Sequence, residues 1–596
     1  MTTIILDYQD IIKNQATINI GCIGHVSEGK STVVRRLTGI ATQRHKSEQE
    51  RNITIKLGYA NFKIWKDFST DELFYTGSDI DTFINPSNGN ETTLVKHVSF
   101  VDCPGHDSFM STMISGTSVM NCAFLLIAAN NKVIPQAQTY EHLIAISNTD
   151  ISNILVLQNK IDLLKNENEA AANLKKIKHF LKGSFAEKSP ILPISAQLGT
   201  NIDSICRYTY ESIPDISKDV NEPLFLPIIR SFDANKPKTS VEKISGGIIG
   251  GSIIRGVLNV GDYLEIRPGI LQTVNNELCC YPIITRVESI QSEKKSIKYA
   301  VPGGLIGIGT TMDPYFCGSN RLIGQVAGKV GSLPPIFEKL NLKLKRLKRG
   351  DLEKQKFSKN ERIMVCINSS TVAATIKTKN KEAVIKLDKP ICCEIGKKCA
   401  LLKNIKGKFT LCYTATILDG KKFERISYRE PISKFTTNDD ITYKIINKFE
   451  NSNEVYDYNY DKLIKNFNFH KNKMDFRINY NSLVVSRAPR QIYVENMKPV
   501  LFSIHKNITS GYNYITNFEK FFTNEINKPC QFTSGSQFSI PGKFTINQIE
   551  KLVDKYIDRY IRCPTCYSNS TFLLKENRIV KISCNLCNST NAVISS

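Results

Sequence analysis

The sequence has no apolar run long enough to cross a membrane. The run at residues 122–129 is far shorter than the roughly 20 residues that a spanning helix needs. Residues 1–10 contain acidic side chains and no small-residue cleavage site, so we expect no secretory signal. These absences argue against a membrane or secreted protein, and we expect a cytoplasmic protein with no membrane partner.

Acidic residues are few relative to basic ones. The 596-residue chain has 56 Asp and Glu against 79 Lys and Arg, a formal net charge of +23. This excess predicts a polyanionic partner such as a nucleic acid. Because secretory features are missing, the 17 cysteines indicate a reducing compartment. The adjacent pairs at 279–280 and 392–393 lack metal-ligand spacing, and we expect them in barrel strands.

Residues 24–31 read GHVSEGKS, a complete phosphate-binding loop. The loop follows a strand pattern and opens into a helical pattern, which makes a chance glycine-rich turn a poor explanation. Its backbone N–H groups would point at phosphate oxygens, Lys30 can reach the β- and γ-phosphates, and Ser31 can ligate Mg²⁺. The predicted nucleotide-binding residues here are Gly24, His25, Val26, Ser27, Glu28, Gly29, Lys30, Ser31 and Thr32.

A second motif, VDCPGH at residues 101–106, ends another predicted strand. Asp102 can hold Mg²⁺ through water, and the N–H of Gly105 can approach the γ-phosphate. His106 can orient an attacking water, or it is an ordinary loop histidine. We therefore predict catalytic roles for Lys30, Asp102, Gly105 and His106.

Two later motifs specify the base. Asp162 in QNKID can accept hydrogen bonds from guanine N1–H and the N2 amine, which adenine does not offer. Asn159 can hold the ring edge and neighbouring loops, and Lys160 can lie along the base. A backbone N–H of the SAQ segment can donate to guanine O6, with predicted contacts at Ser195, Ala196 and Gln197. In this order the motifs predict GTP rather than ATP.

The segment at residues 50–60, ERNITIKLGYA, carries a family resemblance. With GHVSEGKST and VSFVDCPGHD it resembles the gamma subunit of translation initiation factor 2, one of the elongation-factor-Tu-like GTPases. The resemblance implies that Thr54 closes on Mg²⁺ and the γ-phosphate in the GTP state, so that it joins Ser31 and Asp102 as a magnesium ligand. It also makes Asn52 and Tyr59 candidates for binding initiator tRNA, although Tyr59 could equally be a packed strand aromatic.

The chain departs from this family in two places. The family usually has histidine before Gly-Lys, where this chain has Glu28. Because a carboxylate beside phosphates is unfavourable, we expect the Glu28 side chain to point outward. The family also often has a four-cysteine zinc knuckle in the stretch that matches residues 63–95, which contains no cysteine here. We expect only a polar loop without metal in that stretch.

The middle of the chain is rich in strand patterns. Residues 224–328 are short apolar runs broken by Gly and turn residues, a pattern typical of a β-barrel, and 331–426 form a second such block. Both resemble the barrel domains of the gamma family. The resemblance implies that the first barrel and the GTPase domain, residues 1–213, form the pocket for methionylated initiator tRNA.

Residues 427–481 are rich in Asn, Lys, Asp and Tyr and are expected to form a flexible linker. A docking helix is expected at residues 458–468, because four side chains would share one face: Tyr460, Leu463, Ile464 and Phe467. So short a helix needs a surface to dock on.

Two C-x₂-C pairs close the sequence. Their spacing predicts a structural zinc ribbon at residues 562–596, with thiolate ligands Cys563, Cys566, Cys584 and Cys587. Residues 482–561 are expected to be a small α+β domain. The stretch from residue 458 onward resembles the beta subunit of translation initiation factor 2, in which the short helix docks on the gamma GTPase domain. One chain would then join two subunits that are normally separate.

The predicted fold is therefore multidomain: an α/β P-loop GTPase domain, two β-barrels, a linker with a docking helix, a small α+β domain and a zinc ribbon. The resemblance implies a translation initiation GTPase that binds methionylated initiator tRNA in its GTP state. It would deliver this tRNA to the small ribosomal subunit and hydrolyse GTP on start-codon selection. The implied ligands are GTP or GDP, Mg²⁺ and Zn²⁺, and further implied partners are an alpha subunit and GTPase-activating and exchange factors.

Two alternatives stay open from the sequence. An elongation- or selenocysteine-type GTPase would deliver another aminoacyl-tRNA with the same nucleotide motifs. A decoy or regulator would bind GTP without turnover, because an intact nucleotide site does not guarantee hydrolysis.

Overall fold

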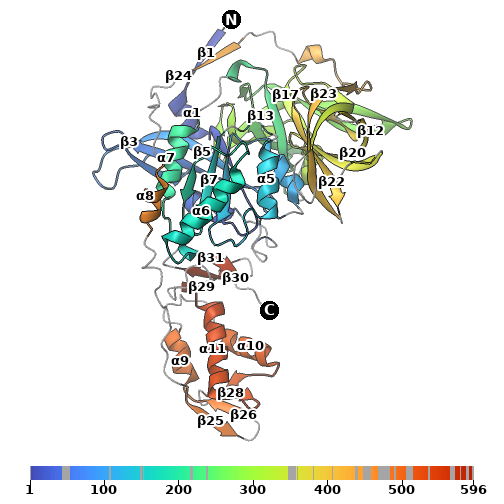
Figure 1. Cartoon of the computed structure of the whole chain (residues 1–596). Coiled ribbons are helices and arrows are strands. Elements are labelled where there is room, and N and C mark those ends of the chain that lie inside the picture. The colour runs from blue at the N-terminus through green and yellow to red at the C-terminus, as the bar shows by residue number, and fades with distance from the viewer. Residues whose placement is uncertain are drawn as a thin grey trace. The chain divides into compact units, whose positions relative to one another are not determined.

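The computed structural model describes residues 2–42, 48, 54, 56–106, 109–147, 149, 151, 153–214, 219–236, 239–346, 357–358, 360–379, 382–405, 407–435, 441–446, 458–467, 483–488, 491–504, 514–533, 537–563, 571–576, 579–584 and 590–592. They fall into two compact units (Figure 1). The larger unit holds residues 1–42, 53–196 and 200–467, and the smaller holds 43–52, 197–199 and 468–596. No helix in the described part of the chain has the length and apolar composition needed to cross a bilayer.

The larger unit begins with an α/β domain around a seven-stranded sheet. In spatial order its strands are β4 (Glu72–Gly77), β3 (Gly58–Asp67), β5 (Thr93–Asp102), β2 (Ile18–Ile23), β6 (Cys122–Ala128), β7 (Asn153–Asn159) and β8 (Ile191–Pro193). Its helices are α1 (Tyr8–Asn14), α2 (Lys30–Thr38), α4 (Met110–Thr117), α5 (Ala137–Ser147), the 3₁₀ helix η2 (Ile161–Leu163), α6 (Glu167–Leu181) and α7 (Ile202–Ser212). Every residue of β2 and β6 is buried, because apolar side chains on both faces of these central strands are covered.

This topology places the sequence motifs at one edge of the sheet. Strands β5, β2, β6, β7 and β8 run parallel, so their carboxyl ends meet at the same edge. The phosphate-binding loop follows β2, Asp102 ends β5, and Asn159 ends β7. Residues distant in sequence are therefore gathered at one site.

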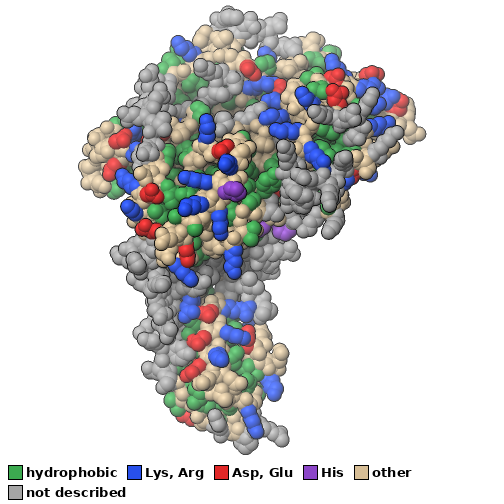
Figure 2. All heavy atoms as spheres, in the orientation of Figure 1, with side chains coloured by type: hydrophobic (Ala, Val, Ile, Leu, Met, Phe, Trp, Pro, Cys, Tyr) green, Lys and Arg blue, Asp and Glu red, His purple; other side chains and the backbone are tan. Residues whose placement is uncertain are grey.

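The outer face of α6 is basic. Three lysines of the helix and one directly after its end are exposed: Lys175, Lys176, Lys178 and Lys182. Figure 2 shows Lys and Arg side chains over the face that carries this helix. Part of the excess positive charge of the chain thus lies in one solvent-exposed cluster of lysines.

The first barrel follows. Its strands are β9 (Phe225–Phe232), β10 (Ile248–Ile253), β12 (Tyr263–Val274), β13 (Glu277–Ser292), β14 (Lys295–Ile297), β16 (Gly303–Thr310) and β17 (Val326–Lys329), with a small pair β11 (Leu258–Asn259) and β15 (Tyr299–Ala300). Strand β12 pairs with both β13 and β17, so the sheet closes on itself. Short 3₁₀ helices lie before and between these strands. They are η3 (Asp219–Asn221) before β9, η4 (Val241–Lys243) between β9 and β10, and η5 (Pro314–Phe316) and η6 (Gly318–Asn320) between β16 and β17.

The second barrel is closed and has the strand order β18–β21–β20–β19–β22–β23. The strands are β18 (Ile336–Arg346), β19 (Glu361–Ile367), β20 (Ser370–Lys379), β21 (Glu382–Cys392), β22 (Lys398–Ile405) and β23 (Lys408–Lys422). Cys279, Cys280 and Cys392 lie in barrel strands, as predicted, and Cys393 directly follows β21. Inward and outward residues alternate along β21, which is the pattern of a strand with one face in a core.

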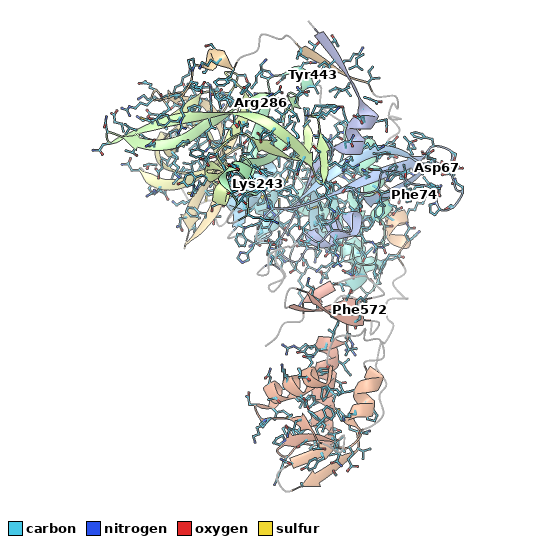
Figure 3. The ribbon with its side chains drawn as sticks, turned by 180° about the vertical axis from the view of Figure 1, so that it is seen from behind. Asp67, Phe74, Lys243, Arg286, Tyr443 and Phe572 are labelled. Carbon is cyan, nitrogen blue, oxygen red and sulfur yellow. The ribbon has the colours of Figure 1, made fainter. Side chains whose placement is uncertain are left out.

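The cysteine-free stretch is more ordered than the polar loop that its composition predicts. It contains β4, which pairs with β3, and a loop held by Asp67 at the end of that hairpin (Figure 3). The Asp67 carboxylate accepts hydrogen bonds from Asn85 Nδ2 and Asn88 Nδ2, both at 2.8 Å, and from the backbone N–H of Ser69 at 2.9 Å. These bonds hold the pKa of Asp67 well below its usual range. Hydrogen bonds to one carboxylate therefore order this loop.

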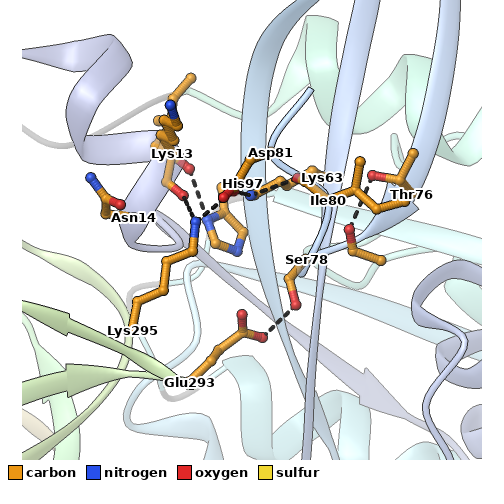
Figure 4. Close-up of polar contacts among 12 residues, drawn as sticks. Lys13, Asn14, Lys63, Thr76, Ser78, Ile80, Asp81, His97, Glu293 and Lys295 are labelled. Carbon is orange, nitrogen blue, oxygen red and sulfur yellow. Dashed lines mark hydrogen bonds and ion pairs between the residues drawn. The ribbon is translucent and has the colours of Figure 1, made fainter. Parts of the chain in front are cut away.

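An ionic cluster joins the α/β domain to the first barrel (Figure 4). Asp81 Oδ1 lies 2.9 Å from the ammonium of buried Lys63 in β3 and 2.5 Å from that of Lys295 in β14. Next to it, Ser78 Oγ donates to Glu293 Oε1 at 2.7 Å. A single carboxylate thus bridges two lysines, one from each domain.

The linker departs from the flexible segment that its composition predicts. Strand β24 (Ile441–Ile446) pairs in parallel with the N-terminal strand β1 (Thr2–Asp7), with Thr2 opposite Ile441 and Asp7 opposite Ile446. Upstream lies a 3₁₀ helix, η7 (Ile432–Lys434). The ladder forms because β1 offers unpaired backbone groups that a second strand can satisfy.

The predicted helix of the linker spans six residues, α8 (Tyr460–Lys465), and is shorter than expected. Its buried side chains Leu463 and Ile464 are joined by Phe467 just beyond its end. Leu463 packs into the core of the α/β domain, and its carbonyl accepts a hydrogen bond from Asn201 Nδ2 at 2.8 Å. The Tyr460 hydroxyl donates to Gln158 Oε1. Tertiary contacts therefore hold a helix that is too short to persist alone.

The smaller unit combines helices with two sheets. Its first sheet has the order β25–β26–β28–β27 and its second β29–β30–β31. The elements are β25 (Val485–Ala488), β26 (Gln491–Val494), α9 (Met497–Ile504), α10 (Tyr514–Ile526), β27 (Gln531–Phe532), β28 (Phe538–Pro541), α11 (Ile546–Tyr560), β29 (Thr571–Glu576), β30 (Ile579–Cys584) and β31 (Thr590–Ala592). A capping box opens α11, with the Gln548 N–H donating to Thr545 Oγ1 and the Thr545 N–H donating to Gln548 Oε1.

Candidate nucleotide-binding site

The phosphate-binding loop leaves β2 and enters α2 at Lys30. Gly29 caps the helix in a left-handed conformation, with φ of 94°. A Cβ at this position would lie 2.2 Å from Asn159 Nδ2, so any other residue would have to displace the Asn159 side chain. The N-terminus of α2 thus faces the site with free backbone N–H groups, a ready anion-binding arrangement.

Lys30 lies inside the loop. It is 5 % exposed, and its ammonium donates to the carbonyls of Gly24 at 2.9 Å and His25 at 2.7 Å. Burial lowers the pKa of Lys30, and the nearby negative charge of Asp102 opposes that shift. The loop therefore holds a buried cation, oriented by its own carbonyls.

Gly105 brings the second motif against the first. A Cβ on Gly105 would lie 2.4 Å from Lys30 Nζ and 2.8 Å from the backbone nitrogen of Val26. Only glycine allows this approach. The loop after β5 can therefore respond to a ligand in the phosphate-binding loop.

Oxygen donors suited to Mg²⁺ gather beside these loops. Ser31 Oγ and Thr54 Oγ1 lie 3.1 Å apart, and Asp102 is fully buried at the end of β5. Thr42 Oγ1 donates to Asp102 Oδ2 at 2.6 Å, a contact that the sequence did not reveal. Hydroxyl and carboxylate oxygens are the ligands that Mg²⁺ prefers, so the three predicted residues fit this ion.

The base-recognition residues are tied together by hydrogen bonds. Asn159 Nδ2 donates to the carbonyl of Glu28 at 2.8 Å, and Asn159 Oδ1 accepts from the N–H of Ala196 at 3.1 Å. Ser195 Oγ donates to Asp162 Oδ1 at 2.6 Å. Lys160 between them is left-handed, with φ of 64°. Gln197 follows in the turn across which the backbones of residues 195 and 200 pair. Asn159, at the end of β7, thus bonds to the phosphate-binding loop through Glu28 and to the loop after β8 through Ala196.

His106 lies on the exposed side of the loop, one residue after Gly105. Its ring centroid is 6.0 Å from that of Phe109, just before α4. The His106 ring is thus exposed to solvent. Its predicted role in orienting the attacking water needs such access to water.

A buried histidine that the sequence did not indicate supports the phosphate-binding loop. The N–H of Gly24 donates to Nδ1 of His142 in α5 at 3.0 Å, and His142 is fully buried. Burial lowers the pKa of His142 to about 3, and the charge of Lys30 adds to that shift. The ring is therefore neutral near pH 7. A lone histidine in an apolar helix carries no local signal for this contact.

Glu28 does not point outward, so this expectation was wrong. The side chain is 1 % exposed, and its carboxylate accepts hydrogen bonds from the backbone N–H of Ala128 and from Asn131 Nδ2, the latter at 2.8 Å. Two donors at the end of β6 make an inward position favourable for a carboxylate.

Of the two residues predicted to bind tRNA, the structure describes only Tyr59. Asn52 lies outside the described residues. Tyr59 is half-buried in β3, with the guanidinium of Arg230 from β9 5.1 Å above its ring. Arg230 also donates to the carbonyl of Leu57 at 2.9 Å. The aromatic ring therefore lies at the junction of the α/β domain and the first barrel.

Two of the four predicted zinc ligands lie in the described residues. Cys563 and Cys584 are buried in one cluster, at 1 % and 2 % exposure. Cys566 and Cys587 lie outside the described residues. Within the described part of the chain no group of three or more His, Cys, Asp or Glu could hold a metal. The two described cysteines, one from each C-x₂-C pair, therefore lie in one buried cluster, and the zinc ribbon itself stays a prediction.

Family models match three parts of the chain. Residues 15–215 match the "Elongation factor Tu GTP binding domain", and residues 338–417 match "Initiation factor eIF2 gamma, C terminal". Residues 469–590 match the domain found in initiation factors 2B and 5. The part of the chain up to residue 417 and the part from residue 469 onward thus match different families.

Curated proteins match most of the chain. Eukaryotic translation initiation factor 2 subunit 3 of Drosophila melanogaster is 46 % identical over 434 residues, which cover 69 % of this chain and 90 % of that protein. The gamma subunits of Schizosaccharomyces pombe and Encephalitozoon cuniculi are 47 % and 43 % identical, and each is covered to 96 %. These alignments cover 69 % and 70 % of this chain.

Solved structures share the fold at low identity. The bacterial selenocysteine-specific elongation factor EF-Sec has a TM-score of 0.51 at 21 % identity, over 68 % of this chain and 59 % of that structure. The elongation factor SelB of Methanococcus maripaludis, in complex with a GTP analogue, has a TM-score of 0.50 at 19 % identity, over 71 % and 81 %. These likenesses show the fold alone, an α/β domain followed by barrels.

Proposed function

The chain belongs to the family of gamma subunits of eukaryotic translation initiation factor 2, and from this premise we propose how it acts. It is a translation initiation GTPase. In its GTP state it binds methionylated initiator tRNA, delivers it to the small ribosomal subunit, and hydrolyses GTP on start-codon selection. The observation that carries this proposal is the meeting of the sequence motifs at one sheet edge. Asn159 bonds to Glu28 and to Ala196, and Gly105 closely approaches the phosphate-binding loop.

Hydrolysis depends mainly on positioning and charge. Lys30 and the N–H groups at the start of α2 hold the phosphates, and Gly105 places its N–H near the γ-phosphate. His106 orients the attacking water from the exposed side of its loop. Mg²⁺, when bound by Ser31, Thr54 and Asp102, would neutralise phosphate charge.

Guanine specificity comes from Asp162. Its Oδ1 is occupied by the Ser195 hydroxyl at 2.6 Å, which fixes the carboxylate for the N1–H and N2 donors of the base. Asn159 keeps the base loops in register with the phosphate-binding loop. A backbone N–H of the segment with Ser195, Ala196 and Gln197 donates to guanine O6; if it is that of Ala196, it must leave Asn159 Oδ1, to which it donates in the structure.

The switch and tRNA contacts belong to the same proposal. Thr54 contacts Ser31 and releases it when the γ-phosphate is lost. Asn52 and Tyr59 contact the tRNA, and Tyr59 is reached from the pocket only if Arg230 moves from its ring. The exposed lysines of α6 suit the phosphate backbone of RNA.

The region after the barrels acts as a fused beta-like subunit. We divide it into a linker at 427–481 with α8 as its docking helix, an α+β domain at 482–561 and a zinc ribbon at 562–596 held by Cys563, Cys566, Cys584 and Cys587. The match of residues 469–590 to the domain of initiation factors 2B and 5 supports a beta-like role for the region as a whole. The chain functions in the cytoplasm with an alpha subunit and with GTPase-activating and exchange factors.

Filter binding of labelled tRNAs tests the proposal. With GTP, the full chain should bind methionylated initiator tRNA more tightly than elongator methionyl-tRNA, and GDP should weaken that binding. Equal affinity for the two tRNAs would contradict an initiation role and favour a general aminoacyl-tRNA carrier. The Lys30→Ala variant should lose the GTP dependence, because the phosphates lose their cation.

A further inference from the structure

The phosphate-binding loop contains a buried carboxylate, that of Glu28, which faces the end of β6. Glu28 links three segments: its carboxylate accepts from Ala128 N–H and from Asn131 Nδ2, and its carbonyl accepts from Asn159 Nδ2. The side chain is 1 % exposed. One residue thus ties the phosphate-binding loop to the end of β6 and to the base-recognition loop.

The groups around Glu28 match an ionised carboxylate. The backbone N–H of Ala128 can only donate, so the oxygen that faces it must accept. The second oxygen faces the amide nitrogen of Asn131 at 2.8 Å. Burial raises the pKa of Glu28, and these hydrogen bonds together with Lys30 and Lys160 oppose that shift. Both carboxylate oxygens accept in this arrangement, which favours a negative charge two residues before Lys30.

The geometry points to Glu28 as a positioning residue that weakens guanine-nucleotide binding and speeds the release of GDP. A buried carboxylate repels anionic phosphates and attracts Lys30, and little water screens it. The chain would then depend less on an exchange factor than a relative with a neutral or cationic residue at this position. This inference rests on the proposed GTP site.

The isosteric variant Glu28→Gln separates charge from shape. The Asn131 amide can rotate to accept from the new NH₂, while the remaining oxygen still accepts from Ala128, so both hydrogen bonds persist. Only the charge is lost. The Glu28→Ala variant loses both the charge and the tether, and it leaves the Ala128 N–H without its acceptor.

The test is the dissociation rate of a fluorescent GDP analogue from the full chain in Mg²⁺ buffer, measured by stopped flow. Glu28→Gln should slow dissociation on the order of tenfold and tighten equilibrium binding of GDP and GTP. Glu28→Ala should gain less than Glu28→Gln, because its loop is no longer held. Glu167→Gln, which neutralises an exposed acid at the start of α6, is the matched control and should leave the rate unchanged.

Three outcomes decide the inference. Slower dissociation in Glu28→Gln, with no change in Glu167→Gln and an unchanged melting temperature, supports it. An equal or faster rate in a folded Glu28→Gln chain overturns it and assigns Glu28 a purely structural role. A wild-type chain that binds no guanine nucleotide would instead overturn the proposed function, which keeps the two failures distinct.

Discussion

The side chain of Asn221 bonds to both the backbone N–H and the backbone carbonyl of Tyr443 in strand β24. Asn221 Oδ1 accepts from the Tyr443 N–H at 2.7 Å, and Asn221 Nδ2 donates to the Tyr443 carbonyl at 3.1 Å. The Tyr443 hydroxyl accepts from Asn259 Nδ2 at 3.0 Å. The segment after the second barrel is thus anchored before α8, and only residues 447–459 lie between the two anchored elements.

Asn221→Ala should loosen this anchor. Each lost hydrogen bond costs about 1 kcal/mol, so amide exchange within residues 441–446 should rise while the barrels stay protected. Hydrogen–deuterium exchange followed by mass spectrometry measures this directly. Asn235→Ala is the control, because it removes the bonds between a half-buried asparagine and Ser245 in the loop that joins β9 to β10. Unchanged protection of residues 441–446 would show that the β1 ladder suffices alone.

Asp162→Asn should change base specificity. Asparagine keeps an oxygen for guanine N1–H but offers an amine where the N2 donor of guanine needs an acceptor. Xanthine has an oxygen there, so affinity for xanthosine triphosphate should rise while that for GTP falls by about 1–3 kcal/mol, the cost of an unmatched donor pair. Competition binding with both nucleotides checks this. If GTP affinity is unchanged in the variant, Asp162 does not read the base.

His142→Asn should reduce the acid sensitivity of folding. The pKa of His142 lies at about 3 in the folded chain, because burial disfavours its charge, against about 6.5 when unfolded. Its contribution to stability is therefore complete above about pH 6.5 and is lost as the pH falls toward 3. Asparagine Oδ1 can replace Nδ1 as acceptor for Gly24 without titrating.

Urea unfolding between pH 7 and 4 measures the effect. The variant should take up about one proton fewer on unfolding, so its free energy of unfolding should depend less steeply on pH. His97 titrates in the same window, since burial lowers its pKa to about 3, and it stays in both chains as an internal reference. An unchanged slope would mean that His142 does not titrate on unfolding.

Zinc content should follow the four cysteines. Metal analysis of the purified chain should find about one zinc per molecule, and Cys566→Ser should lower it, because three thiolates bind less tightly than four. Cys530→Ser, which replaces a buried cysteine of the α+β domain, controls for general disruption. Equal zinc in the Cys566→Ser chain would place the metal elsewhere.

Much of the site could be predicted because its motifs are local. The phosphate-binding loop needs glycines, a lysine and a hydroxyl at fixed spacing, and Asn159, Lys160 and Asp162 occupy a single turn. Parallel strands then bring such turns to one edge, so the order of the motifs predicts their meeting. The capping box of α11 was predictable for the same reason, since its two partners are three residues apart.

The direction of Glu28, the support by His142 and the course of the linker were decided only in the tertiary structure. Glu28 takes its partners from Ala128 and Asn131, about a hundred residues away, and no pattern around position 28 encodes those donors. Strand β24 pairs with β1 across more than four hundred residues, because an open strand edge accepts any segment that reaches it. The sequence by itself determined the ligand chemistry, through residues close enough to act together before folding. The tertiary structure decided which distant donors and strand edges satisfy the remaining polar groups.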